Sequence, residues 1–117
     1  MTELRSTSPD GRYLIQVHLW EARMSHWIES PEILDSRTGE VLLRFEDGNW
    51  SLDDAFWENG TVVRLNLRKY PGDHPSAFKV YVSLEACTAV FEERQLELSG
   101  LEPALEKAYQ RGGRPNS

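Results

Sequence analysis

The chain has 117 residues, of which 39% are hydrophobic and 27% are charged, and its formal net charge is −6. This is typical of one soluble globular domain, residues 1–117, that buries roughly two-thirds of its unfolded surface. Phosphate binding requires a basic surface, so the acidic charge argues against nucleic acid as a partner. Uncharged apolar runs have only the length of strands, which argues against a membrane as a partner.

The single cysteine, Cys87, excludes an internal disulfide and a zinc site made of several cysteines. The polar N-terminal residues do not have the apolar core of a secretory signal. Both observations favour a cytoplasmic location.

The first predicted strand follows an Asp-Gly turn. We expect residues 1–7, which are polar and terminal, to be disordered. From residue 13 onward apolar side chains alternate with others, as in a strand that has one buried face. The residues expected on that face are Tyr13, Ile15, Val17 and Leu19.

Two further strands are expected before the middle of the chain. Residues 26–35 ("HWIESPEILD") have an extended pattern, in which Pro31 indicates an edge, a bulge or the start of a new strand because it cannot donate to a ladder. A turn that places Gly39 in the left-handed region then leads to a strand over residues 40–45 ("EVLLRF").

The second half contains the clearest hairpin pattern. The "NG" pair at residues 59–60 predicts a two-residue type I′ turn between a short strand over 55–57 and a long strand over 61–69. A further strand pattern follows at residues 76–85, and a shorter one at residues 88–93. The apolar side chains expected to face the core from these strands are Val63, Leu65, Leu67, Val80 and Val82.

The last element changes to the period of a helix. Residues 99–113 ("SGLEPALEKAYQRGG") place apolar side chains on one stripe, and Ser99 and Glu102 have the spacing of a capping box. We expect residues 111–117 to be disordered.

Two stretches, "SPDGRYL" and "LDSRTGEVL", resemble a blade of a TolB-like or WD40-like β-propeller, and "AFWENGTVV" resembles a second, degenerate blade start. The two starts lie about 50 residues apart, which is in the range of blade repeats. A closed propeller needs at least four blades, so this resemblance implies an arrangement of strands and neither a ring nor a central-channel site.

We therefore expect a mainly β fold with one C-terminal α-helix. The strands, about 7–8 in number, would form an antiparallel sheet or a sandwich in two blade-like halves. The boundary between the halves is expected near residues 48–52. The halves can stack face to face or join edge to edge, and the sequence leaves both arrangements open.

No established catalytic, nucleotide-binding or metal-binding motif is present in the sequence. His18, His26 and His74 are far apart along the chain, and their spacing is not that of a metal site. We expect no cofactor, no metal and no catalytic residue, which favours a protein that is not an enzyme.

The segment "HLWEARMSHW" is the richest candidate for binding, because Trp, Met and Arg are enriched at the centres of protein interfaces. The loop "KYPGDHP" can share the same rim. A small acidic domain that binds one protein partner is analogous to the immunity proteins that neutralise toxins. The predicted interface consists of Trp20, Arg23, Met24, His26, Trp27, Tyr70 and His74.

Other interpretations remain open at this point. Trp20 and Trp27 can instead pack as a cross-strand pair that stabilises a hairpin. A small-ligand binder or an enzyme would place His26, Arg68 and His74 in a cleft between the two halves. A homodimer would form through exposed strand edges.

Overall fold

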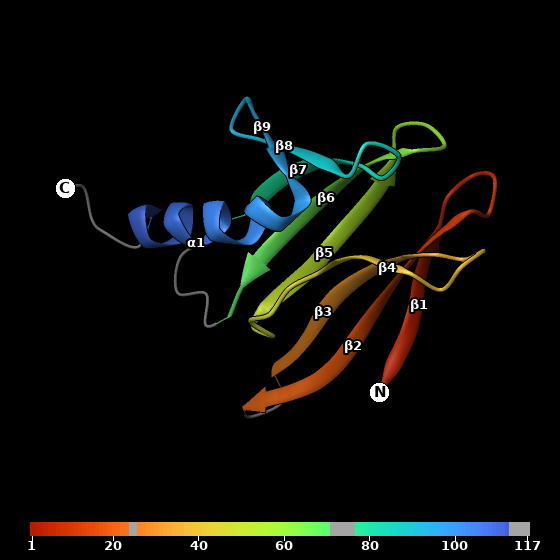
Figure 1. Ribbon diagram of the computed structural model, residues 1–117. Coiled ribbons are helices and arrows are strands. Elements are labelled where there is room, and N and C mark those ends of the chain that lie inside the picture. The colour runs from red at the N-terminus through yellow and green to blue at the C-terminus, as the bar shows by residue number, and fades with distance from the viewer. Residues whose placement is uncertain (24–25, 71–76, 113–117) are drawn as a thin grey trace.

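In the computed structural model, which describes residues 1–23, 26–70 and 77–112, nine β-strands form two antiparallel sheets (Figure 1). In each sheet, neighbouring strands are also consecutive in the chain. The four-stranded sheet consists of β1 (Thr2–Thr7), β2 (Tyr13–Arg23), β3 (His26–Asp35) and β4 (Val41–Arg44). The five-stranded sheet consists of β5 (Trp50–Trp57), β6 (Val62–Lys69), β7 (Phe78–Ser83), β8 (Thr88–Phe91) and β9 (Arg94–Glu97). A short 3-10 helix, η1 (Leu98–Gly100), leads into the helix α1 (Leu101–Gly112).

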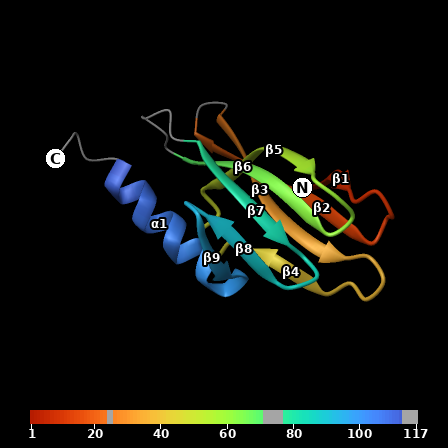
Figure 2. The ribbon, with the colours of Figure 1, turned by 90° about the horizontal axis from the view of Figure 1, so that it is seen from above.

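The predicted fold class is confirmed: the protein is mainly β, antiparallel, with one C-terminal helix. The chain passes from the first sheet to the second between Arg44 and Trp50. The strands of the two sheets overlap when they are seen from above (Figure 2). Their inner faces, together with the apolar side of α1, form one hydrophobic core. The expected core residues Ile15, Val17, Val63, Leu65, Leu67, Val80 and Val82 are all fully buried there.

The expectation that residues 1–7 are disordered is wrong. They form β1, which pairs with β2 from Thr2, opposite His18, to Thr7, opposite Leu14. β1 is an edge strand with mostly exposed side chains, so its position is set by backbone hydrogen bonds and the sequence does not need an apolar face there. At the other end, Arg111 and Gly112 belong to α1, and residues 113–117 lie outside the described residues.

The Ser-Pro-Asp-Gly segment builds the turn between β1 and β2. The N–H of Ser8 donates to the carbonyl of Tyr13 (2.9 Å), and the N–H of Tyr13 donates to Ser8 Oγ (3.0 Å). Asp10 Oδ1 accepts the N–H of Arg12, and this bond, with a second from the Ser8 hydroxyl, lowers the pKa of Asp10. Gly11 adopts a φ of 79°, a conformation that glycine reaches without strain. The segment therefore fixes the register of the first two strands.

The predicted hairpin of β5 and β6 is present, but its turn is not of type I′. A type I′ turn needs positive φ at both central residues, and neither Asn59 nor Gly60 has one. The loop is longer: the N–H of Glu58 donates to the carbonyl of Val62 (2.8 Å). Asn59 Oδ1 accepts the N–H groups of Thr61 (2.8 Å) and Val62 (2.9 Å), so a side chain and not a left-handed backbone closes this turn.

A two-residue turn with left-handed backbone occurs instead between β8 and β9. Phe91 pairs with Arg94, and the two residues between them, Glu92 and Glu93, have φ values of 55° and 63°. This is the conformation of a type I′ turn, which favours Asn and Gly. Two glutamates in these positions are strained, which is why the sequence does not suggest a hairpin here.

α1 lies at one end of the two sheets (Figure 1) and completes the core there. Leu101, Leu105 and Ala108 are buried, as the predicted apolar stripe requires. Trp50 is fully buried beside the helix, with its ring centroid 6.3 Å from that of Tyr109. No helix within the described residues has the length and apolar composition to cross a membrane.

We predict that Glu93→Gly stabilises the protein. A non-glycine residue in the left-handed region costs roughly 1–2 kcal/mol, and glycine loses roughly 0.5–1 kcal/mol more backbone entropy on folding, which leaves a gain of about 0.5–1 kcal/mol. Urea unfolding measures this change. Glu85→Gly is the matched control, because Glu85 is also exposed in a turn but does not have a positive φ. Equal effects of the two substitutions would contradict the explanation.

Candidate functional site

The structure separates the two tryptophans of the predicted interface. Trp20 pairs with Ile28, and Trp27 pairs with Glu21, so the two indole rings lie on opposite faces of the β2–β3 ribbon. They are therefore not a cross-strand pair. Trp20 is 39% exposed and donates its Nε1–H to the carbonyl of Gly48 (3.1 Å), while Trp27 is 57% exposed.

The other predicted interface residues are described only in part. Tyr70 is half-buried after the end of β6, where its N–H donates to the carbonyl of Asn49 (2.9 Å). Arg23 and His26 lie at the ends of β2 and β3, but their side chains lie outside the described part of the chain. Met24 and His74 lie outside it altogether.

Of the alternative ligand cleft, only Arg68 has a described side chain. Its guanidinium is exposed and bonds to Asp53 Oδ1 (2.8 Å). Two well-formed hollows lie beside α1, and Arg68 lines neither of them. No three histidine, cysteine or carboxylate groups among the described residues are arranged to hold a metal ion.

The first hollow, the basic hollow, has a volume of about 210 Å³ and lies between the β8–β9 hairpin and α1. Its charged lining residues are Glu92, Arg94, Lys107 and Arg111. The second hollow, of about 440 Å³, lies between β4 and α1, and its charged lining residues are Arg44, Glu46, Glu102 and Glu106.

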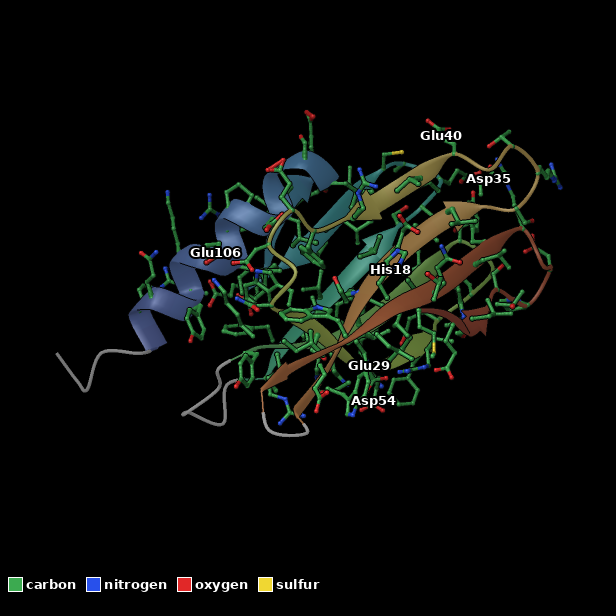
Figure 3. The ribbon with its side chains drawn as sticks, turned by 90° about the horizontal axis from the view of Figure 1, so that it is seen from below. His18, Glu29, Asp35, Glu40, Asp54 and Glu106 are labelled. Atoms are coloured by element: carbon green, nitrogen blue, oxygen red, sulfur yellow. The ribbon has the colours of Figure 1, made fainter. Side chains whose placement is uncertain are left out.

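A polar cluster on the outer face of the four-stranded sheet connects all four strands. His18 on β2 (Figure 3) contacts Thr2 Oγ1 through Nδ1 (2.9 Å) and Glu32 Oε1 through Nε2 (3.2 Å). Glu32, which is buried, also accepts the amide N–H of Gln16 (2.6 Å) and lies 3.8 Å from Arg44 Nη1. Buried carboxylates require such partners.

This cluster contains a hydroxyl, an imidazole and a carboxylate in sequence, which is the order of groups in a nucleophilic triad. Neither of the two hollows beside α1 is lined by Thr2, His18 or Glu32. The contacts instead join β1 to β2, β2 to β3, and β3 to β4. We interpret the cluster as a structural link.

The ammonium of Lys69, at the end of β6, is enclosed by carboxylates and aromatic rings, and its side chain is 13% exposed. Its Nζ contacts both carboxylate oxygens of Glu106 on α1 (2.6 and 2.8 Å; Figure 3 labels Glu106) and Asp47 Oδ2 (3.1 Å). Trp50 Nε1–H donates to Glu106 Oε2 (3.0 Å), and Nζ lies 5.0 Å from the centre of the Tyr109 ring. Lys69 thus connects β6, the loop after β4 and α1.

A second carboxylate of α1 holds the same loop. Glu102 accepts the backbone N–H groups of Glu46 (2.8 Å) and Asp47 (2.9 Å). This is the residue that the sequence places in a capping box with Ser99. Its carboxylate instead bonds to a segment far away in the chain and fixes the start of the helix against β4.

The charges of the Lys69 cluster shift the pKa values of its members. Burial by itself would lower the pKa of Lys69, but the hydrogen bonds and charges of Glu106 and Asp47 raise it above its ordinary value. Burial by itself would raise the pKa of Asp47, but the N–H of Asn49 and the ammonium of Lys69 lower it. Folding therefore favours the charged ammonium of Lys69 and the charged carboxylate of Asp47.

The outer face of the five-stranded sheet carries a row of large side chains, which we call the outer row. It consists of Phe56, Arg64, Tyr81 and Val90, each paired with the next across four neighbouring strands. Phe56, Tyr81 and Val90 are 46%, 36% and 40% exposed. The Arg64 guanidinium stacks over the Phe56 ring, with Cζ 4.6 Å from its centre.

Arg64 also has an unsatisfied donor. Its Nε is buried and has no hydrogen-bond partner in the part of the chain that the structure describes. Among the described residues, Arg64 forms no ion pair, although the face also carries Asp54. The sequence does not reveal this row, because alternation in these strands identifies the inward side chains. The outward residues align only when the register of all four strands is known.

Comparison of the chain with models of protein families, with curated proteins and with solved structures finds no match.

We predict that Lys69→Met destabilises the protein by about 2 kcal/mol. Removing one partner of a buried ion pair costs about 3–5 kcal/mol, and the cost is lower here because Glu106 and Asp47 keep contact with water. Urea unfolding measures the loss. The control is Lys107→Met on the exposed side of α1, for which we expect a change within about 0.5 kcal/mol. Equal losses would show that Lys69 does not hold the helix.

We also predict a pH dependence that Asp47 causes. Since folding lowers the pKa of Asp47 below its ordinary 3.8, its contribution to stability is present above that pH and is lost as the pH falls through the folded-state pKa. The free energy of unfolding should therefore differ between the wild type and Asp47→Asn at about pH 7, and this difference should shrink below pH 3.8. Urea unfolding at several pH values tests this. A difference that stays constant down to about pH 2.5 would contradict it.

Proposed function

We propose that the protein is a non-enzymatic domain that binds one protein partner through the outer row. The observation that supports this most is the alignment of Phe56, Arg64, Tyr81 and Val90 on one open sheet face. The solvent face of an antiparallel sheet is normally polar. Aromatic residues and Arg are enriched at the centres of interfaces, where a few such residues supply most of the binding energy.

The state of Arg64 suggests the chemistry of the partner. The Arg64 guanidinium forms no ion pair with another described residue, and a carboxylate from another molecule would give it a charge-assisted hydrogen bond. Tyr81 and Val90 continue the row as apolar surface. The proposed partner therefore presents an acidic side chain opposite Arg64 and apolar side chains beside it.

The proposal also includes a location and a role for the protein. The single cysteine favours a cytoplasmic location, and neutralisation of a toxin is one role that suits an acidic protein-binding domain. Trp27, exposed on the β2–β3 ribbon, is the competing surface, because it is the most exposed tryptophan of the predicted interface.

Site-specific photocrosslinking tests the proposal. A benzophenone amino acid replaces Tyr81 in one variant and Val41 in a matched variant, since Val41 is equally exposed but lies on the other sheet. In the cells that produce the protein, we expect one protein to be crosslinked at position 81 and not at position 41. Arg64→Glu should abolish this product, and Arg37→Glu, the same charge change in an exposed loop, should not.

With the purified partner, Arg64→Glu should weaken binding by about 2 kcal/mol or more. The thermal unfolding of both arginine variants should match that of the wild type, because neither side chain belongs to the core. Equal crosslinking at both positions would contradict the proposal. A crosslinked homodimer at position 81 would replace it with self-association.

A further inference from the structure

The basic hollow carries positive charge in a protein whose net charge is −6. Arg94 reaches it from β9, and Lys107 and Arg111 reach it from α1. Its single carboxylate, Glu92, is engaged by Arg111 (3.0 Å). Three cations therefore surround a hollow that holds one paired anion.

We propose that the basic hollow binds a small anionic ligand that has a carboxylate or phosphate group and a short apolar body. This site does not depend on the proposed function. Val90 of the outer row and Phe91 of the hollow are neighbours in β8, so their side chains lie on opposite faces of the sheet.

Two of the three cations have no partner for their side chains in the described structure, and this supports an anionic ligand. The side chains of Arg94 and Lys107 form no hydrogen bond or ion pair with another residue that the structure describes. Lys107 and Arg111 lie four residues apart on the helix, so their charges are neighbours and repel each other. The negative end of the helix dipole favours cations near Arg111, but it does not account for Arg94 on the facing strand. An anion between the three cations would offset the repulsion.

The second hollow is larger, but its carboxylates on α1 already have partners within the protein. Glu102 bonds to two backbone N–H groups, and Glu106 bonds to Lys69 and Trp50. Its carboxylates are therefore used by the protein itself, in the attachment of α1. The basic hollow differs because the side chains of two of its cations, Arg94 and Lys107, have no such role in the described structure.

The size and walls of the basic hollow limit the ligand. Its volume of about 210 Å³ is below the roughly 300–1,000 Å³ of sites for drug-sized molecules. Phe91, Leu96 and Ala104 supply apolar wall. A ligand with one charged group and one small ring or short chain satisfies both parts of the site.

A titration followed by ¹H–¹⁵N NMR tests the proposal with four probes: benzoate, phenyl phosphate, inorganic phosphate and the neutral benzyl alcohol. We expect benzoate or phenyl phosphate to shift the amide resonances of residues 91–96 and 104–111 in a saturable manner. The tighter of the two identifies the charged group. The double variant Arg94→Gln/Lys107→Gln should weaken that binding about tenfold or more, whereas Arg37→Gln should leave it unchanged.

Three results would overturn the proposal. Equal binding of benzyl alcohol would show that charge does not contribute, and equal binding of inorganic phosphate would show that the apolar wall does not. Shifts confined to other parts of the chain would show that the hollow is not a site. The two substituted residues are exposed and make no described polar contact, so we expect the double variant to fold.

Discussion

The enclosure of one ammonium group, that of Lys69, determines how the three parts of this fold meet. A buried charge is unfavourable unless it is paired and hydrogen-bonded. Lys69 meets this condition only where β6, the loop after β4 and α1 come together, because Asp47 and Glu106 belong to the other two segments. The same geometry brings the apolar stripe of α1 onto the open end of the core. Both hollows border α1, so their shape depends on this attachment as well.

The two sheets use their outer faces differently. On the four-stranded sheet, the polar groups satisfy one another: Glu32 is bound by side chains from β2 and lies near Arg44 of β4. On the five-stranded sheet, Arg64 stacks on an aromatic ring and forms no ion pair with another described residue. The central carboxylate of the first face therefore has its partners within the described protein, whereas the central cation of the second face does not. This contrast is the reason for assigning the binding function to the outer row.

Much of the fold could be predicted because alternation specifies which side chains of a long strand are buried. Alternation does not identify these two edge strands. β1 and β9 are short and mostly exposed, so nothing in their composition distinguishes them from loops. The candidate sites were harder to predict, because a shift of one residue in strand register moves a side chain to the opposite face of the sheet. Trp20 and Trp27 lie on opposite faces for this reason. The outer row and the Lys69 cluster join residues far apart in the chain, and no local pattern predicts them. The resemblance to propeller blades stays a prediction.

The central claim is that the partner covers the outer row and leaves the β2–β3 ribbon open. Hydroxyl-radical footprinting, with and without the purified partner, tests it most directly, because it reports the solvent contact of individual aromatic side chains. The account predicts that the partner slows the oxidation of Phe56 and Tyr81 and leaves the oxidation of Trp20 and Trp27 unchanged. Protection of Trp20 or Trp27 without protection of Phe56 and Tyr81 would contradict it and would place the interface on the β2–β3 ribbon.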